Sequence, residues 1–160
     1  MCKIMIVEDN QHIRKLFKNI LNDKGYDIIE VEDGEKAIKI YDRLAEKPEI
    51  IVVDYRLPTL NGLEFTQAIL ARDPTSSILM ISGDPKIDKS TAKQWGIRFC
   101  AKPITKNDLI SEIENLDQTH HTRFDFMNNS TYLLDENFQE TSGRNGIFVQ
   151  EDFGYKIKLY

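Results

Sequence analysis

The stretch IIVVDYRLPTLNG, residues 50–62, decides the fold class. Four branched apolar residues run directly into Asp54, and the chain then breaks up around Pro58 and Gly62. A continuous apolar run indicates a strand that is buried on both faces, and the proline and glycine indicate a loop after it. A charged side chain that ends a buried strand gains nothing from helix capping when YRLPT follows. Asp54 is therefore a candidate functional residue.

Similar apolar runs recur along the chain, and each predicts a strand. Including the run around Ile50, they read KIMIV from Lys3, DIIEV from Asp27, EIIVV from Glu49, SILMI from Ser77 and IRFCA from Ile97. The segments between them have helical spacing, as in Ile13, Leu16 and Ile20, which fall on one helix face. Strand and helix are thus expected to alternate five times.

Residues typical of helix ends support this division. Gly25 is expected to close the first helix, and Asp84 is expected to cap the fourth helix with Pro85 in its first position. Thr105 and Asp108 fit a capping box for the last helix. Strands that are apolar on both faces require helices on either side. The prediction is an α/β fold, a doubly wound (βα)5 parallel sheet of flavodoxin-like order 2-1-3-4-5, over residues 1–118.

Composition limits the classes of protein that fit. The chain has 160 residues, of which 41% are hydrophobic, which suits one core with an extension. It contains no apolar run long enough for a membrane span and no signal peptide, so we expect a cytoplasmic protein. Cys2 and Cys100 are far apart and are expected to pack as small residues. The net charge of -5 makes nucleic-acid binding an unfavoured function.

Polar side chains follow four of the predicted strands at the edge where a doubly wound sheet places its chemistry. They are Glu8, Asp9, Asp54, Ser82 and Lys102. With strands one and three adjacent, the three carboxylates would share one cleft, and a hard divalent cation such as Mg2+ would compensate them. Lys102 and Ser82 would then bind a phosphoryl group, and Asp54 would attack it as the nucleophile.

Each of these residues alone has a simpler explanation. Asp9 or Asn10 fits an N-cap, Ser82 fits a turn before Gly83, and Lys102 fits an exposed loop before a proline. Their joint occurrence at the ends of four strands favours a functional site.

Four segments resemble the receiver domain of two-component response regulators. They are VEDN after the first strand, VVDYRLPTLNG at the third, ISGD at the fourth and FCAKP at the fifth, within Lys3 to Leu116. The resemblance implies a phosphoprotein of phosphorelay signal transduction, not an enzyme acting on other molecules. Asp54 would accept phosphoryl from a sensor histidine kinase or phosphotransfer protein.

The resemblance also implies a role for each site residue. Asp9 would bind Mg2+ directly, Glu8 largely through water, and the backbone carbonyl of Arg56 would be a further ligand beside Asp54. Lys102, before a cis Pro103, would pair with the phosphoryl group. Ser82 and the aromatic Phe99 would form the conformational switch. Gly83 and Trp95 depart from the residues common at their positions, and Gly83 should loosen the loop. Arg56 and Asp84 flank the acceptor, where an exposed arginine could hinder or order an attacking water, or where both could simply be solvated.

The segment 119–160 resembles no usual DNA-binding effector. After Leu116 the helical pattern stops, and residues 117–160 hold seven acids, four bases and eight of the fifteen aromatic residues. IFVQ and YKIKLY predict a β-hairpin, and TYLL from Thr131 predicts another strand. An isolated hairpin is marginal in water, so the extension is expected to pack on the receiver part or on a second copy of the chain. A homodimer through this extension, or through the face of the fourth helix, fifth strand and fifth helix, is one hypothesis.

Two alternative functions stay open at this point. The chain could be a docking or dimerisation module that is not phosphorylated, or a transcription regulator with a β-type effector. A flavin protein is disfavoured because EDN after the first strand would repel phosphate without a metal, and an aspartyl phosphatase because Arg56 stands where a second acid is typical.

Overall fold

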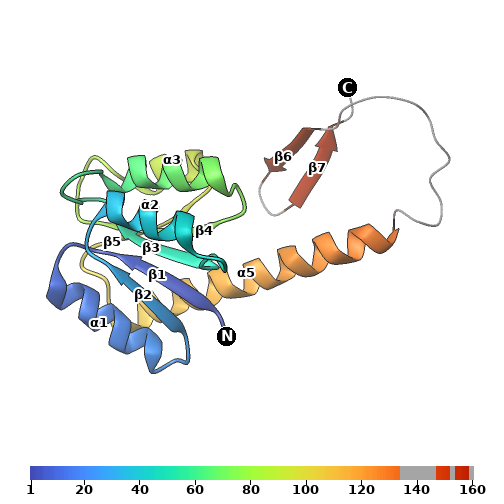
Figure 1. Ribbon diagram of the computed structural model, residues 1–160. Helices are drawn as coiled ribbons and strands as arrows, with labels where there is room; N and C mark the ends of the chain where they lie inside the picture. Colours follow the sequence, from blue (N-terminus) through green and yellow to red (C-terminus); the bar gives the residue numbers. More distant parts are fainter. Residues whose placement is uncertain (134–146, 152–153, 159–160) are drawn as a thin grey trace. The chain divides into compact units, whose positions relative to one another are not determined.

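The first unit of the chain is an open parallel sheet covered by helices on both faces. In the computed structural model, the described residues are 1–133, 147–151 and 154–158, and they fall into two compact units, Met1–Phe124 and Asp125–Tyr160. The strands are β1 (Lys3–Val7), β2 (Asp27–Val31), β3 (Ile50–Asp54), β4 (Ser77–Ser82) and β5 (Arg98–Ala101). They pair in parallel in the order β2-β1-β3-β4-β5 (Figure 1). The predicted strand order is confirmed.

Five helices connect and follow these strands. They are α1 (Gln11–Asn22), α2 (Gly34–Arg43), α3 (Gly62–Arg72), α4 (Lys89–Gln94) and α5 (Lys106–Leu133). Figure 1 shows α2 and α3 on one face of the sheet and α1 and the start of α5 on the other. The doubly wound arrangement follows from the central strands β1, β3 and β4, which are buried on both faces.

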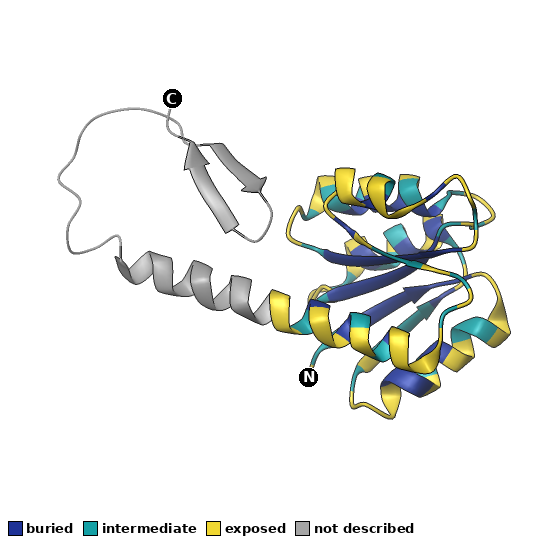
Figure 2. Ribbon diagram, turned by 180° about the vertical axis from the view of Figure 1, so that it is seen from behind, coloured by how far each residue is buried: buried dark blue, intermediate teal, exposed yellow. Residues whose placement is uncertain are grey.

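Two apolar cores result, one on each face. Alternate residues of β1 divide between them: Met5 packs with Phe65 of α3, whereas Ile4 packs with Leu21 of α1 and Leu109 of α5. All these side chains have no solvent exposure. Figure 2 shows the central strands as the most buried layer. Burial on both faces holds the ends of β1 and β3 rigidly, and these ends carry the acids identified in the sequence.

The predicted start of the fourth helix is wrong. We expected Asp84 as its N-cap, but α4 begins after Asp88, whose carboxylate accepts a hydrogen bond from the Thr91 amide at 2.9 Å. The Asp84 carboxylate instead accepts from the Lys86 amide at 2.9 Å, so Pro85 lies in a turn. Both aspartates suit an N-cap by type, and the turn at Asp84 leaves a loop of several residues between β4 and α4.

The predicted end of the last helix is also wrong. The expected capping box is present, with the Asp108 amide 3.1 Å from Thr105 Oγ1 and the Thr105 amide 3.3 Å from Asp108 Oδ2. However, α5 runs to Leu133, past Leu116 and through most of TYLL, which we expected to be a strand. The apolar spacing marks only where the helix packs on the core. The sequence has neither proline nor glycine between Pro103 and Gly143 to end the helix earlier.

The second unit contains the predicted hairpin. Strand β6 (Ile147–Glu151) pairs antiparallel with β7 (Gly154–Lys158), and Val149 lies opposite Lys156. The remainder of the predicted extension, including residues 134–146, lies outside the described residues.

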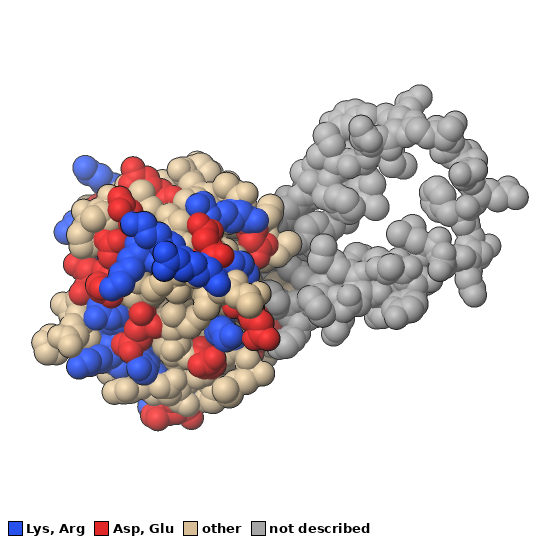
Figure 3. Space-filling view, in the orientation of Figure 1, with Lys and Arg blue, Asp and Glu red and all other residues tan. Residues whose placement is uncertain are grey.

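Charged side chains of both signs share the surface around α2. Figure 3 shows Lys and Arg side chains gathered in this view, with Asp and Glu beside them. Lys36 pairs with Glu32 at 2.6 Å, and Arg72 pairs with Asp42 at 2.8 Å. This face therefore offers alternating charges rather than the uniform basic surface that binds a phosphate backbone.

Candidate functional site

Three carboxylates meet at the carboxyl ends of β1 and β3. The two strands are neighbours in register, with Val7 opposite Val53, so Glu8 and Asp54 follow adjacent residues. Oxygen atoms of Glu8, Asp9 and Asp54 all lie within 4.8 Å of one another. Glu8 and Asp54 are buried, whereas Asp9 is exposed. The site is thus an acidic cluster with one member open to solvent.

The strand-to-helix turn after β1 explains why Asp9 is available. Asn10 is the N-cap of α1, and its side chain accepts hydrogen bonds from the amides of His12 and Ile13 at 2.9 and 3.2 Å. The Asn10 amide in turn donates to Glu8 Oε1 at 3.1 Å. Of the two capping candidates, Asn10 caps the helix and Asp9 does not. The Asp9 carboxylate therefore remains beside Glu8 and Asp54.

Lys102 supplies the positive charge of the site. Its Nζ lies 3.0 Å from Asp54 Oδ2 and 3.2 Å from Glu8 Oε2. The Lys102 amide donates to the Ser82 carbonyl at 2.8 Å, and the bond to Pro103 is cis, as the resemblance implied. Strands β4 and β5 thereby bring Ser82 and Lys102 to the acids that end β1 and β3.

Burial and charge shift the pKa values of this cluster in a consistent way. Burial, followed by the negative charge of Asp54, raises the pKa of Glu8, while the Asn10 amide and Lys102 oppose that rise. Burial acts to lower the pKa of Lys102, but its hydrogen bond to Asp54 and the charges of Glu8 and Asp54 outweigh burial and raise it. Lys102 therefore remains charged at neutral pH. The three acids exceed the one lysine in charge, so the cluster favours a further cation.

The donor set fits a hard divalent cation. Three carboxylate groups offer oxygen ligands within reach of one point, and the exposure of Asp9 leaves room for water. Mg2+ is typically held by one or two carboxylates and several waters. Arg56, whose carbonyl is the fourth predicted ligand, lies two residues beyond Asp54 in the loop from β3 to α3. The residues present thus suit Mg2+.

Gly62 shapes the loop that carries Arg56. A Cβ atom at position 62 would lie 2.5 Å from the Asp54 carbonyl oxygen and 2.7 Å from Tyr55 Cα, so only glycine fits here. The Gly62 amide donates to the Tyr55 carbonyl at 2.8 Å and closes the loop. Asn61 then begins α3 through a capping box with Glu64. The break in IIVVDYRLPTLNG thus turns the chain sharply around the acceptor candidate.

Ser82 and Phe99 lie at a cavity beside the cluster. Ser82 is buried, and its Oγ accepts a hydrogen bond from the Asp84 amide at 2.9 Å. Both residues line a cavity of about 540 Å³ together with Ile87 and Lys102. Gly83 also lines it, and a Cβ there would make an ordinary contact of 3.5 Å with Lys102 Cβ. The loop before α4 therefore has space into which side chains can move.

An ion pair joins the two loops that flank Asp54. Arg56 donates from Nε and Nη2 to Asp84 Oδ2, at 3.2 and 3.1 Å. Arg56 is 70% exposed and Asp84 15% exposed. The Lys86 amide, followed by Arg56, lowers the pKa of Asp84. The two residues that sequence analysis noted beside the acceptor thus contact each other across the loops after β3 and β4.

Sequence analysis missed one residue that contacts the acidic turn. Arg14 of α1 donates from Nη1 to the backbone carbonyls of Glu8 and Asp9, at 2.6 and 3.3 Å. Its position one helical turn after the N-cap was the only available signal. Every residue type has a backbone carbonyl, so the residue types of Glu8 and Asp9 do not indicate this contact.

Comparisons with known proteins agree on one family. The model of the family described as "Response regulator receiver domain" matches residues 4–114. The chain is 32% identical over 117 residues to the chemotaxis protein CheY of Listeria monocytogenes, which covers 71% of this chain and 97% of that protein. It is also 32% identical over 114 residues to the alkaline phosphatase synthesis transcriptional regulatory protein PhoP of Bacillus subtilis, covering 70% of this chain but 47% of that protein.

Solved structures agree on the fold. A response regulator receiver domain protein from Clostridium thermocellum has a TM-score of 0.72 at 20% identity, covering 76% of this chain and 98% of that one. None of the described helices has the length and apolar character needed to cross a membrane.

Proposed function

Because the chain belongs to the response regulator receiver domain family of two-component signalling, we propose that Asp54 accepts a phosphoryl group from a sensor histidine kinase or a phosphotransfer protein. One observation carries the proposal. Lys102 Nζ lies within 3.2 Å of both Asp54 and Glu8, at a cluster of three carboxylates that share one strand edge. Acids with a fixed lysine among them suit transfer of a group with several negative oxygens.

In the proposed transfer step, the side chains of the site attack, pair with and position the phosphoryl group. A carboxylate oxygen of Asp54 attacks phosphorus, and the new O–P bond forms as the P–N bond to the donor imidazole breaks. The bonding electrons stay with the departing nitrogen. Lys102 Nζ, 3.0 Å from Asp54, pairs with a phosphoryl oxygen. Ser82 Oγ accepts from the Asp84 amide, so its own proton can be donated to another phosphoryl oxygen.

Mg2+ would be held by Glu8, Asp9, Asp54 and the backbone carbonyl of Arg56. When bound, the ion supplies positive charge that neutralises the phosphoryl oxygens. Asp9 is the exposed acid and would bind it directly, whereas the buried Glu8 already accepts from Asn10 and Lys102 and would act largely through water. Beyond its own phosphorylation and dephosphorylation, the chain would catalyse nothing.

The proposed output is a two-state change around Ser82 and Phe99. When the Ser82 hydroxyl turns toward the phosphoryl group, the half-buried Phe99 can occupy the cavity that both residues line. This would alter the face formed by α4, β5 and α5, which would bind the cytoplasmic output partner or a second copy of the chain.

Acetyl phosphate with Mg2+, followed by intact-mass measurement, tests the acceptor. Wild type is expected to gain one phosphoryl group, and Asp54→Ala is expected to gain none. Asp27→Asn, at an exposed acid that begins β2, is the control and should behave as wild type. A wild type that gains no mass, beside a competent control receiver, would contradict the proposal and favour a docking module that is not phosphorylated.

The single tryptophan, Trp95, provides a test of the switch because it ends α4 and is 40% exposed. Its emission should change on phosphorylation of wild type and change less in Ser82→Ala. Equal changes in the two proteins would contradict a switch through Ser82.

A further inference from the structure

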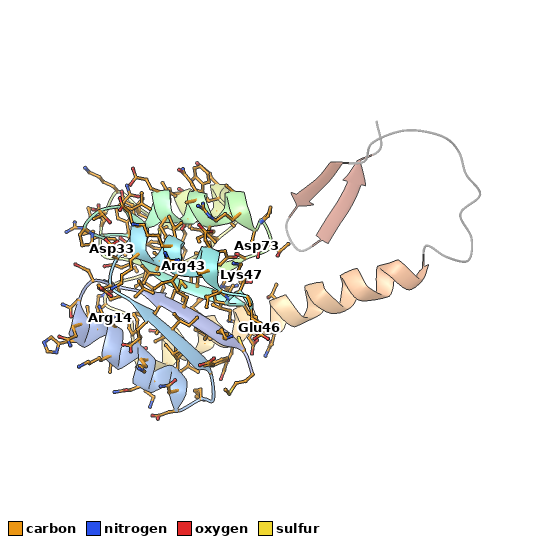
Figure 4. All side chains as sticks on the ribbon, viewed as in Figure 1. Arg14, Asp33, Arg43, Glu46, Lys47 and Asp73 are labelled. Carbon is orange, nitrogen blue, oxygen red and sulfur yellow. The ribbon has the colours of Figure 1, made fainter. Side chains whose placement is uncertain are left out.

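Arg14 reaches back from α1 to the turn that carries two of the acids. Its amide closes the first helical hydrogen bond, to the Asn10 carbonyl at 2.9 Å. Its Nη1 donates to the carbonyls of Glu8 and Asp9, and its side chain is only 15% exposed. Figure 4 shows Arg14 and Asp33 at one end of the sheet, with Glu46 and Lys47 at the other. Arg14 thus belongs to the edge where the acids lie.

The guanidinium group lies between the two carbonyls and an acid of β2. While Nη1 contacts the carbonyls, Nε lies 4.0 Å from Glu30 Oε1. Glu30 is fixed on β2, where it pairs in register with Ile6 of β1, and its second oxygen lies 2.6 Å from Lys18 Nζ. A planar group with separate donors can span such a gap, whereas an ammonium cannot.

We propose that Arg14 is a positioning residue for the acidic pair and sets the affinity of the site for Mg2+. This inference rests on the proposed function. By holding the carbonyls of Glu8 and Asp9, Arg14 fixes the two peptide planes on either side of the Asp9 Cα. The direction of the Asp9 Cα–Cβ bond, and so the region that its carboxylate can reach, follows from them. Outer contacts of this kind typically change metal affinity by about 10–100-fold when they are lost.

Electrostatics alone predicts the opposite sign. A guanidinium near the acidic cluster repels a dication, so removal of its charge would strengthen Mg2+ binding if charge were its only role. The geometry points to a different outcome, because Arg14 contacts the carbonyl oxygens of the acidic pair rather than its carboxylates, and Glu30 lies 4.0 Å from its Nε. The sign of the change in affinity therefore separates the two roles.

Isothermal titration of the full chain with MgCl2 tests the proposal. Arg14→Met, which keeps an apolar stem, and Arg14→Lys, which keeps the charge, should each raise the Kd for Mg2+ by about tenfold. Arg98→Met and Arg98→Lys are matched controls, because Arg98 pairs with Glu112, at 2.7 Å from its Nε, and not with the acidic turn. They should bind Mg2+ as wild type does. Urea unfolding in EDTA measures the stability of each variant separately.

Phosphorylation by acetyl phosphate supplies a second readout. In Arg14→Lys the Mg2+ concentration for half-maximal rate should rise about tenfold while the rate at saturating Mg2+ stays near that of wild type. Two results would overturn the role of Arg14 without affecting the proposed function. One is a set of Arg14 variants that lose stability but keep the Kd of wild type, and the other is an Arg14→Met protein that binds Mg2+ more tightly. A wild type that binds no Mg2+ would overturn both this role and the metal step of the proposed function.

Discussion

Two clusters of titratable side chains lie at opposite ends of the same two strands. The carboxyl-end cluster, Glu8, Asp9 and Asp54, follows β1 and β3. The amino-end cluster is formed by Cys2 before β1, Glu49 before β3 and Asp117 of α5. In each cluster, one possible metal-binding atom from each of the three residues lies within 4.8 Å of the others. By proximity alone the two are equivalent.

Their electrostatic surroundings differ. At the carboxyl end, Lys102 contacts two acids and opposes the rise in the pKa of Glu8. At the amino end, burial and the charges of Asp117 and Glu49 all raise the pKa of the Cys2 thiol. Burial and then Asp117 raise the pKa of Tyr26 to about 12. A lysine thus opposes burial in the first cluster, whereas burial and the two acids act together on the thiol in the second.

This difference explains why only one of the two clusters is a candidate binding site for a metal. The Cys2 thiol and the Tyr26 hydroxyl remain protonated at neutral pH and donate hydrogen bonds to the nearby carboxylates. That arrangement joins the start of β1 to α5 and leaves little demand for a cation. The carboxyl-end cluster combines three carboxyl groups with a lysine, so it suits a metal and a phosphoryl group.

Removal of the lysine should have the largest effect. Lys102→Met is expected to slow phosphorylation by acetyl phosphate by about two orders of magnitude, because a fixed charge on the transferred oxygens is lost. Lys24→Met is the control. Lys24 Nζ lies 3.6 Å from Glu114 Oε1, and this pair does not belong to the carboxyl-end cluster. Intact-mass time courses measure both rates. Equal phosphorylation rates for the two variants would contradict a role for Lys102 in the transfer.

Mg2+ should stabilise the chain through the carboxyl-end cluster alone. A ligand at ten times its Kd adds about 1.4 kcal/mol to the free energy of unfolding. Urea unfolding of wild type with Mg2+ and with EDTA should show this gain. Asp9→Asn should lose it, and Glu49→Gln, the matched change at the amino end, should keep it. If the gain in stability were lost in Glu49→Gln and kept in Asp9→Asn, Mg2+ would bind at the amino-end cluster rather than at the carboxyl-end cluster.

Sequence patterns predicted most of the fold and placed the carboxyl-end cluster, for identifiable reasons. The apolar run before Asp54 is typical of a buried parallel strand, and adjacent parallel strands bring their ends together, so Glu8 and Asp54 could be paired from order alone. The start of α4 was missed because Asp84 and Asp88 are both good N-caps, and only the fold chooses between them. The run of α5 past Leu116 was missed because the apolar stripe ends where packing ends.

Contacts made by long side chains or across long separations escaped prediction. Arg14 binds carbonyl oxygens, which every residue has, and therefore leaves no pattern. Asp117 meets Cys2 only because α5 packs beside β1, and neither residue belongs to a motif.

The amino-end cluster can be tested through its thiol. A raised pKa leaves less thiolate at a given pH, so Cys2 should react slowly with iodoacetamide. Asp117→Asn removes a charge that raises this pKa, so more thiolate forms and alkylation of Cys2 should be several-fold faster at pH about 8, up to about tenfold for a full unit. Cys100 is the internal control, because its pKa is raised by burial, Glu112 and Asp108 rather than by Asp117. Peptide mass spectrometry separates the two sites. An unchanged alkylation rate of Cys2 would show that Asp117 does not raise the pKa of the Cys2 thiol.

The smallest effect concerns the loops that border the carboxyl-end cluster. Arg56 and Asp84 connect the loops that follow β3 and β4, and we expect Arg56→Gln, which removes this connection, to ease the access of water to Asp54. Such ion pairs are weak, so loss of phosphoryl from Asp54 should become only about two- to threefold faster. Arg72→Gln, at the Arg72–Asp42 pair far from Asp54 in the fold, is the matched control. It should leave the phosphoryl lifetime unchanged and the stability of the fold close to that of wild type. The lifetime follows from intact-mass measurement after removal of acetyl phosphate. A longer lifetime in Arg56→Gln would mean that Arg56 orders the attacking water rather than hindering it.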